Sequence, residues 1–309
     1  MIDAITARGE SWVIVERGGW YVEVYASDCS AMTRIETELP AIRIAAIGDF
    51  HVKHEFPTEV AGDLTLLHER ADVLVVAGDM TDNGRIVEFE MVADQLAAVK
   101  LPVIAVLGNH DRRCLRRTAL RRILERGGVM LLDGQATSVE LKIAPAGPGF
   151  DRPVRAGLAG VGGYGGGFWP EEGPLLPPYR AAQALALRAR REALRLDEAL
   201  HQIETGVDYR VAVLHYAPTS TTLGDEPLVK QWMLGNIQLA HVIDRHPVDL
   251  VIHGHAHLGN PEGATPGGTP VRNVASQVVG LPVVYRLPVT AGRGNVPAAE
   301  PAHLPGISA

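Results

Sequence analysis

Five short clusters of polar residues in this 309-residue chain carry side chains that can bind metal ions or transfer protons. They combine aspartate, asparagine and histidine, and most of them include a glycine. In chain order the clusters are Asp49-Phe50-His51, Gly78-Asp79-Met80-Thr81-Asp82-Asn83-Gly84, Gly108-Asn109-His110-Asp111, Leu214-His215 and Gly254-His255-Ala256-His257. Each cluster stands at the end of a short apolar run, so the five share a position in the pattern as well as a composition.

The mixture of oxygen and imidazole groups indicates a site for more than one ion. Carboxylate and carboxamide oxygens suit Mn²⁺ or Mg²⁺, whereas imidazole suits Zn²⁺, iron or Mn²⁺. The clusters offer seven candidate ligands, too many for one tetrahedral zinc but enough for two ions that share a bridging carboxylate. Two ions about 3.5–4 Å apart assist in-line displacement at phosphorus, because they neutralise phosphoryl oxygens and turn a bridging water toward hydroxide. Glycines at positions 48, 78, 108 and 254 let the backbone turn sharply and approach an ion closely.

The apolar runs that must position the first three clusters alternate with helix-like stretches. The runs 42–47, 73–77 and 103–107 are separated by segments such as 86–99, which is long enough for a helix. This pattern is typical of a parallel β-α-β sheet that is buried on both faces. Residues just beyond the carboxyl ends of such strands gather at one edge of the sheet, where ligands bind.

The second half of the chain is richer in predicted strands than in helices, which indicates a second sheet facing the first. An amphipathic helix is expected at 179–204, because apolar residues recur there with a helical period. The segment 160–178, rich in Gly and Pro, is expected to be a loop. Its Phe168 and Trp169 either form a lid that stacks on a base or anchor the loop to the core. Seven further strands are predicted at 129–132, 138–143, 156–161, 211–214, 250–252, 271–275 and 283–287.

The expected organisation is an N-terminal extension at 1–40, one domain at 41–290 and a flexible tail at 291–309. Two β-rich runs in the extension, 12–16 and 20–25, are joined by a turn with two glycines, which predicts a hairpin. Whether residues 1–31 belong to the native product stays open, because Met32 also precedes the domain.

The acidic composition excludes partners that require a broad positive surface. Lys and Arg number 29 against 36 Asp and Glu, a net charge of −7 with neutral histidines. We therefore expect neither duplex nucleic acid nor a membrane as a partner. The two cysteines exclude a thiolate zinc site and fit a reducing compartment. No apolar run reaches about 20 residues and the N-terminus lacks a signal-peptide pattern, so a cytoplasmic location is expected.

Taken in order, the five clusters resemble the five motifs of the calcineurin-like metallophosphoesterase superfamily: Asp-x-His, Gly-Asp-x-x-Asp, Gly-Asn-His-Asp, a lone His and Gly-His-x-His. The resemblance extends over residues 42–290 or so. It implies an α/β fold built as a four-layer α/β/β/α sandwich of two facing mixed sheets. It also implies two divalent metal ions, which are Mn, Fe, Zn or a mixture of them. The implied ligands are Asp49, His51 and His257 for the first ion, Asn109, His215 and His255 for the second, and Asp79 as the bridge.

The resemblance also assigns catalytic residues and a subclass. It implies that His110 is a non-ligand that contacts a phosphoryl oxygen or protonates the leaving group, and that Asp82 or Asp111 orients it. The chain departs from the phosphoprotein phosphatases at Asn83, where they have Arg, and at Asp111, where they have Glu. The Arg that would clamp a phosphoserine is absent. The motifs look more like the phosphodiesterase branch, which includes cyclic-nucleotide and glycerophosphodiester enzymes.

The implied function is hydrolysis of a small phosphate ester, with nucleotides as one option, by a metal-bridging hydroxide. A phosphomonoesterase or nucleotide pyrophosphohydrolase with the same centre stays open, as does a catalytically silent interaction scaffold. A homo-oligomer is also open, since the N-terminal hairpin could pair edge to edge. We expect His253 and Cys114 to be structural. Arg112 and Arg113 either steer an anionic substrate or form a solvated face.

Overall fold

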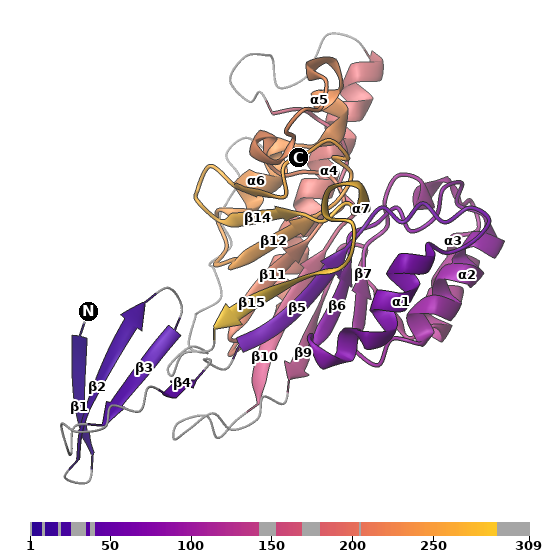
Figure 1. Cartoon of the computed structure of the whole chain (residues 1–309). Coiled ribbons are helices and arrows are strands. Elements are labelled where there is room, and N and C mark those ends of the chain that lie inside the picture. The colour runs from indigo at the N-terminus through magenta and orange to yellow at the C-terminus, as the bar shows by residue number, and fades with distance from the viewer. Residues whose placement is uncertain are drawn as a thin grey trace.

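Two β-sheets lie face to face, and helices cover the outer face of each sheet (Figure 1). The computed structural model describes residues 2–7, 10–17, 20–25, 35–37, 41–141, 153–168, 180–203 and 205–288. Three separate buried clusters of apolar side chains fill the spaces between the layers. The predicted four-layer α/β/β/α sandwich is therefore confirmed.

The first sheet has five strands in the order β15-β5-β6-β7-β8. Strands β5 (Ala41–Ile47), β6 (Val73–Val76), β7 (Val103–Ala105) and β8 (Val129–Leu131) run parallel to one another. Strand β15 (Val283–Pro288) returns from the end of the domain and pairs antiparallel with β5. The predicted β-α-β pattern forms most of this sheet, and a late strand closes its edge.

The second sheet has six strands in the order β13-β14-β12-β11-β10-β9. Its four central strands run parallel, while β9 and β13 pair antiparallel at the two edges. Both sheets are therefore mixed, as expected. The strands are β9 (Gln135–Leu141), β10 (Val154–Gly160), β11 (Tyr209–Val213), β12 (Leu250–His253), β13 (Glu262–Ala264) and β14 (Pro270–Asn273).

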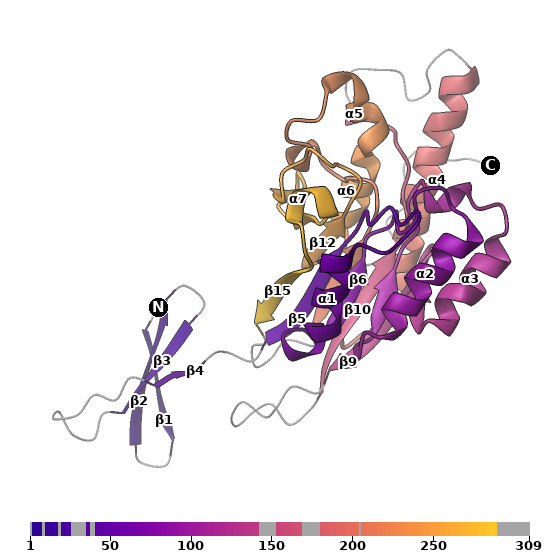
Figure 2. The same ribbon diagram turned by 45° about the vertical axis from the view of Figure 1, so that its right-hand side comes forward.

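The helices form the two outer layers. Helices α1 (Thr58–Leu66), α2 (Ile86–Ala97) and α3 (Arg117–Arg126) pack on the first sheet, and α4 (Arg180–Gln202) and α6 (Ile237–Ile243) on the second (Figures 1 and 2). Among the described helices, none combines the length and apolar character that a membrane span requires. The shorter elements are α5 (Leu228–Leu234), α7 (Ser276–Val279) and 3-10 turns at Leu67–Glu69, Asp111–Arg113 and Ser220–Thr222.

Alternate side chains of each central strand enter different cores, because successive residues of a strand point to opposite faces. On β5, Ile44 packs between the two sheets and Ala45 packs beneath the first helical layer. On β11, Val211 packs between the sheets and Ala212 packs against the second helical layer. All four side chains are fully buried. Burial on both faces explains why these strands read as continuous apolar runs.

Each strand predicted within the domain is present, with its ends shifted by a few residues. The predicted helices at 86–99 and 179–204 correspond to α2 and α4. The sequence pattern did not reveal α1, in which Val60 and Leu64 are the buried residues and Gly62 lowers helix propensity. Short elements with few buried side chains leave too weak a periodic signal to predict.

The N-terminal strands form a separate four-stranded antiparallel sheet that lies apart from the sandwich in both views (Figures 1 and 2). Strands β2 and β3 pair with Arg17 opposite Trp20, so the predicted hairpin is present. The tail at 291–309 lies outside the described residues. The strands of this sheet are β1 (Ile2–Ala7), β2 (Glu10–Arg17), β3 (Trp20–Tyr25) and β4 (Ile35–Thr37).

Candidate metal centre

The five polar clusters meet at one edge of the sandwich, where strands of both sheets end. The two sheets are joined at this edge, because the Gly48 amide donates a hydrogen bond to the Val274 carbonyl (2.8 Å). The side chains that follow strands far apart in the chain therefore lie close together. The loops after β5, β6, β7, β11 and β12 carry, in order, Asp49, Asp79, Asn109, His215 and His255.

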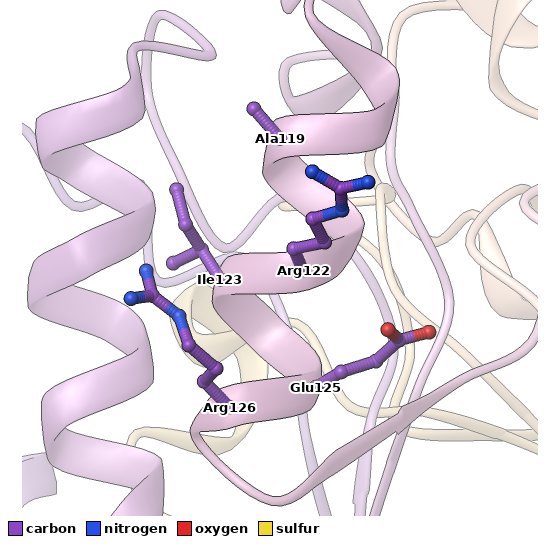
Figure 3. Close-up of a pocket in the computed structure, with 5 residues that line it drawn as sticks. All are labelled: Ala119, Arg122, Ile123, Glu125 and Arg126. Carbon is purple, nitrogen blue, oxygen red and sulfur yellow. The ribbon is translucent and has the colours of Figure 1, made fainter.

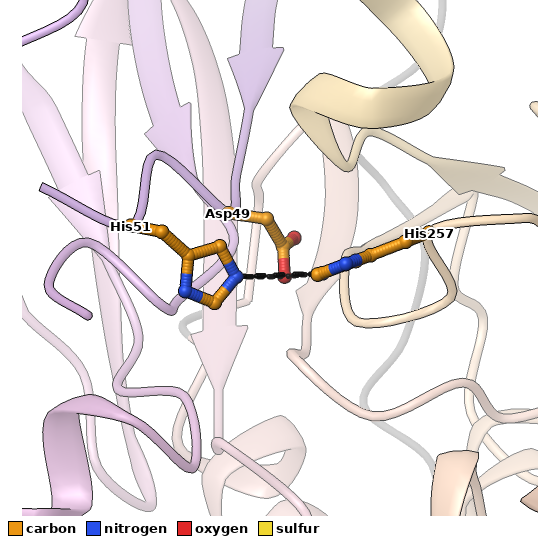
Figure 4. Close-up of side chains that lie close together, drawn as sticks. All are labelled: Asp49, His51 and His257. Atoms are coloured by element: carbon orange, nitrogen blue, oxygen red, sulfur yellow. Dashed lines mark hydrogen bonds and ion pairs between the residues drawn. The ribbon is translucent and has the colours of Figure 1, made fainter. Parts of the chain in front are cut away.

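Asp49, His51 and His257 form the first group of side chains that could hold an ion. His257 Nε2 lies 3.0 Å from Asp49 Oδ1. His51 Nε2 lies 3.4 Å from His257 Nε2 and 3.9 Å from Asp49 Oδ1. Figure 4 shows the two imidazole rings pointing toward one another, edge to face, with the Asp49 carboxylate between them. The three side chains thus present two nitrogens and one oxygen to a common point.

Asp79, His215 and His255 form the second group. His215 Nε2 lies 3.4 Å from Asp79 Oδ2 and 2.9 Å from the side-chain oxygen of Asn109. The Nδ1–H of His215 donates to the Ala77 carbonyl (2.9 Å), which leaves Nε2 as the atom that can bind a metal.

His255 is held through the other ring nitrogen than His215. Its Nε2–H donates to the Met233 carbonyl (3.3 Å), so Nδ1 is the nitrogen left to bind a metal. Its backbone amide donates to the Asp49 carboxylate (3.0 Å to Oδ2). One residue of the second group therefore also positions a carboxylate of the first group.

Asp79 lies between the two groups. Its Oδ2 is 3.9 Å from His51 Nε2 in the first group and 3.4 Å from His215 Nε2 in the second. Its Oδ1 accepts a hydrogen bond from the backbone amide of His110 (2.7 Å). One buried carboxylate can therefore serve both groups of ligands.

Four of the expected ligands have a left-handed backbone. The φ angle is +57° at Asp49, +49° at His51, +46° at Asp79 and +70° at His255. In the part of the chain that the structure describes, these are the non-glycine residues with positive φ. This conformation costs of order 1 kcal/mol or more per residue and is typical of functional sites. Backbone strain is thus concentrated at the residues that face the centre.

The side chains of the centre shift one another's pKa values. Burial alone would raise the pKa of Asp79, but the charge of His215 and a hydrogen bond from it hold that pKa well below its usual range. Burial alone would lower the pKa of His215, but Asp79 raises it to about 9. Burial lowers the pKa of His255 to about 3. Asp79 and His255 are therefore in the forms that bind metals, whereas an ion must displace a proton from His215.

His110 borders both groups, and the Asp82 backbone holds one of its ring nitrogens. Its Nδ1–H donates to the backbone carbonyl of Asp82 (2.6 Å), and the Asp82 carboxylate lies 3.7 Å from the same nitrogen. The ring centroid of His110 lies 4.5 Å from that of His51, with the rings edge to face. His110 Nε2 lies 3.3 Å from the guanidinium of Arg113. The imidazole thus stands beside the ligands with one nitrogen fixed.

Asp111 does not orient His110, and this part of the expected catalytic set is corrected. Its side chain turns to the backbone beneath the site, because the 3-10 turn that starts at Asp111 buries it fully. Burial and the charge of Asp79 raise the pKa of Asp111 to about 7. The residue joins the loops after β6 and β7. Its carboxylate accepts hydrogen bonds from Met80 N (3.2 Å), Thr81 N (2.9 Å), Thr81 Oγ1 (2.8 Å) and Gly108 N (3.1 Å).

Several supporting residues carry no motif and were missed from the sequence. The Ser276 hydroxyl donates to the backbone carbonyl of Asp49 (2.7 Å), and Gln277 donates to the same oxygen (3.3 Å). The Tyr216 ring stacks obliquely on His255, with centroids 4.4 Å apart. The one sequence signal that could have indicated Tyr216 is its position directly after His215.

Three other residues considered from the sequence have structural contacts within the domain. His253 is fully buried and bonded through Nδ1 to Gly254 O (2.7 Å) and through Nε2 to the Thr222 hydroxyl (2.9 Å). Cys114 is a buried free thiol, as expected for a structural residue. Arg112 forms ion pairs with Asp133 (3.2 Å) and Glu192 (3.4 Å), and its side chain is 12% exposed, so it does not form a solvated face.

The described part of the glycine-rich loop packs on the domain. The Gly166 and Gly167 amides donate to the Gly235 carbonyl (2.9 and 3.0 Å). Phe168 packs on a small apolar cluster that includes Leu223 and Leu234, which favours its role as an anchor. Trp169 and the rest of the expected lid lie outside the described residues.

Two surface hollows differ in their relation to the centre. One runs along α3 (Figure 3), and none of its lining residues belongs to the five clusters. Another is lined by Phe50 and Ser276, so it borders the loop that carries Asp49 and His51. The hollow on α3 is lined by Ala119, Arg122, Ile123, Glu125 and Arg126.

The donor chemistry of the centre fits metal ions. Each group combines a buried carboxylate with imidazole nitrogens that face inward, and bonds to main-chain carbonyls fix the rings of His215 and His255. The buried Nδ1 of His51 has no hydrogen-bond partner among the described residues. Such a set of oxygen and imidazole ligands suits Mn, Fe or Zn.

The facing mixed sheets and this centre place the protein in the class of metallophosphoesterases. Residues 42–259 match the family model described as calcineurin-like phosphoesterase, which is more than two thirds of the chain. The chain belongs to the calcineurin-like phosphoesterase family, and the resemblance found in the sequence is confirmed.

A short part of the chain is similar to a glycerophosphodiester phosphodiesterase. Over 53 residues it is 38% identical to the glycerophosphodiester phosphodiesterase GpdQ of Enterobacter lignolyticus (strain SCF1). The matched segment spans 17% of this chain and 19% of that relative. The similarity therefore concerns a fraction of either protein.

Several solved structures are similar at low identity. GAP50, described as the anchor in the inner membrane complex of Plasmodium, has a TM-score of 0.48 and 15% identity over 77% of this chain and 72% of its own. The protein TT1561 of Thermus thermophilus has a TM-score of 0.43 and 17% identity over 75% and 88%. Purple acid phosphatase PPD1 from yellow lupin seeds has a TM-score of 0.45 and 12% identity over 93% and 53%.

Proposed function

We propose that this protein is a metal-dependent phosphodiesterase that hydrolyses small phosphate esters. The observation that carries the proposal is the placement of the buried Asp79 carboxylate between two groups of carboxylate and imidazole ligands. Membership of the calcineurin-like phosphoesterase family and the segment similar to a glycerophosphodiester phosphodiesterase support it.

The ligand assignment follows the two groups. Two ions held there would neutralise phosphoryl oxygens and lower the pKa of a water molecule. Mn, Fe, Zn or a mixture of them fits the donor set. We assign Asp49, His51 and His257 to one ion, Asn109, His215 and His255 to the other, and Asp79 to both.

His110 is the residue that we assign to the leaving group. The bond from Nδ1 to the Asp82 carbonyl fixes the ring, so Nε2 is the atom that would carry a proton to a departing oxygen, once it gives up the hydrogen bond that it accepts from Arg113. The amide of the same residue holds Asp79 Oδ1. His110 therefore couples the position of the bridging carboxylate to the position of the proton donor.

A diester suits the site better than a monoester, because a monoester carries close to two negative charges near neutral pH and requires more positive charge for binding. Position 83 has no guanidinium to supply that charge. The Asn83 amide instead donates to the carboxylates of Asp82 (3.0 Å) and Glu88 (3.1 Å), so it is occupied in positioning Asp82. Phosphomonoesters and nucleotide pyrophosphates are the alternative substrates.

A cytoplasmic location is part of the proposal. The support for it is the low cysteine content, which fits a reducing compartment. The net charge of −7 supports a small phosphate ester rather than duplex nucleic acid or a membrane as the partner.

The test is turnover of a generic diester, bis-p-nitrophenyl phosphate, against the monoester p-nitrophenyl phosphate. Each is assayed with Mn²⁺, Zn²⁺, Fe²⁺ or Mg²⁺, and bound metal is measured by mass spectrometry. We expect metal-dependent turnover that is faster for the diester. Asp79→Asn keeps the size of the side chain and removes its charge, so it should lose metal and most activity. Asp94→Asn, at an exposed position on α2, is the matched control.

Each other outcome contradicts part of the proposal. An Asp79→Asn protein with full metal content and full turnover would exclude the assigned centre. Faster monoester turnover would identify a phosphomonoesterase. Wild-type protein that binds no metal and hydrolyses neither ester would instead be a docking scaffold.

A further inference from the structure

A second cluster of ligand-type side chains lies on the outer helical layer of the second sheet. Asp197 and His201 are four residues apart on α4, so they project from the same face of the helix. His246 lies in the turn between α6 and β12. One potential ligand atom from each of the three side chains lies within 4.8 Å of the others.

The three side chains are already in contact. His246 Nε2 lies 2.8 Å from Asp197 Oδ1. The rings of His201 and His246 meet edge to face, with centroids 4.5 Å apart and an interplanar angle of 85°. The side chain of His246 is 5% exposed, that of Asp197 is 23% exposed, and His201 is at the surface. The cluster is thus closed on its inner side and accessible from solvent through His201.

The hydrogen bonds of His201 fix which of its nitrogens can bind an ion. Its Nδ1 lies 2.8 Å from the backbone carbonyl of Asp197, and a carbonyl oxygen can only accept. Nδ1 therefore carries the proton, and Nε2 keeps a free lone pair. A metal-binding histidine whose other nitrogen donates to a carbonyl is a common arrangement in proteins.

Arg245 also contacts the carboxylate of Asp197. Its Nη2 lies 3.3 Å from Asp197 Oδ1, and its Nη1 donates to the backbone carbonyl of His241 (3.1 Å). An ion between His246 and Asp197 must displace the proton of His246 Nε2, since the carboxylate oxygen opposite that nitrogen accepts it. Arg245 and the ion would then share the negative charge of Asp197.

We propose that Asp197, His201 and His246 form a third metal site, separate from the centre at the strand ends. Two imidazoles and one carboxylate are a ligand set for Zn²⁺, with water in the fourth position of a tetrahedron. An ion there would join α4 to the turn that enters β12, and so would stabilise the contact between α4 and α6. The proposal does not depend on the phosphodiesterase activity.

The test is the number of zinc ions per chain, measured by equilibrium dialysis at fixed free Zn²⁺. His201→Ala removes one ligand at a surface position, so it should not affect folding. His241→Ala is the matched control, because His241 is also an exposed histidine in the last turn of a helix and is outside the cluster. We expect His201→Ala to bind about one zinc fewer than the wild type and His241→Ala. Turnover of the phosphate ester should be equal in all three proteins.

Thermal unfolding gives an independent measurement. Zn²⁺ that binds the folded protein raises the midpoint temperature of its unfolding. The share of this increase that is due to the proposed site should be missing in His201→Ala and in Asp197→Asn. Equal zinc content and an equal zinc-dependent midpoint in His201→Ala and His241→Ala would overturn the proposal. The proposal would also be overturned if Asp79→Asn lost all of the zinc that the wild-type protein binds.

Discussion

Gly254 lies directly against the carboxylate of Asp49. A Cβ atom built on Gly254 would overlap Asp49 Oδ2 and stand 3.1 Å from the Ala77 carbonyl oxygen. The Asp49 side chain has little room to retreat, because it is fully buried and accepts a hydrogen bond from the His255 amide. Glycine at this position thus allows the end of a strand in the second sheet to lie against the Asp49 carboxylate, which follows a strand of the first sheet.

Gly254→Ala should therefore displace Asp49 and weaken metal binding. A displacement of about 1 Å at a catalytic group costs roughly 100-fold in turnover, and we expect at least that loss. Metal content and kcat are the measurements.

Gly62→Ala is the matched control, because a Cβ there meets no atom within 4 Å. This exposed position on α1 should keep full turnover and gain up to about 1 kcal/mol in the free energy of unfolding. Normal metal content in Gly254→Ala would show that the loop adapts more readily than the close approach implies.

His110→Ala should separate proton transfer from metal binding. The imidazole stands beside the ligands but is fixed by the Asp82 carbonyl. Loss of a general acid lowers kcat by about 10²–10⁴-fold, while both ions should remain. The checks are kcat, and metal content by mass spectrometry. Loss of metal together with activity would make His110 a ligand instead.

The two aspartates near His110 should behave differently. Asp111→Asn places an amide group against backbone donors in a fully buried site, so we expect a loss of about 1–3 kcal/mol in the free energy of unfolding. Asp82→Asn keeps the backbone carbonyl that holds His110, and should change kcat by no more than about fivefold. Urea unfolding and kcat of both variants check this. A stable Asp111→Asn protein would contradict the structural role of Asp111.

Tyr285 on β15 should make the protein less stable at alkaline pH. Burial raises the pKa of its hydroxyl to about 12, while an unfolded tyrosine ionises near pH 10. The folded state disfavours the ionised form of Tyr285. The contribution of the un-ionised hydroxyl to the free energy of unfolding is therefore complete below pH 10 and is lost as the pH rises toward 12. The loss is up to about 2 kcal/mol.

Tyr285→Phe removes this ionisation and serves as the comparison. The difference in unfolding free energy between the wild type and Tyr285→Phe is measured at pH 8 and at pH 11.5. We expect the wild type to lose more stability between the two pH values. Parallel losses would show that the hydroxyl ionises equally in both states.

The amino-acid sequence alone determined most strands of the domain and the clusters at their ends. Runs such as 73–77 are apolar throughout because both faces of their sheet are buried, and a strand buried on both faces has a recognisable composition. The five clusters could be read in order because each stands at a strand end. The seven ligand candidates therefore required no coordinates.

Only the tertiary structure decided how close these groups lie to one another and which neighbours hold them. Asp111 reads as a catalytic residue in the sequence, yet its carboxylate faces three backbone amides. The left-handed backbone of Asp49 and Asp79 leaves no mark in composition. His215 meets the Ala77 carbonyl 138 residues away, because two sheets come together at one edge. Local patterns encode the faces of strands, whereas contacts between distant loops depend on the packing of the whole domain.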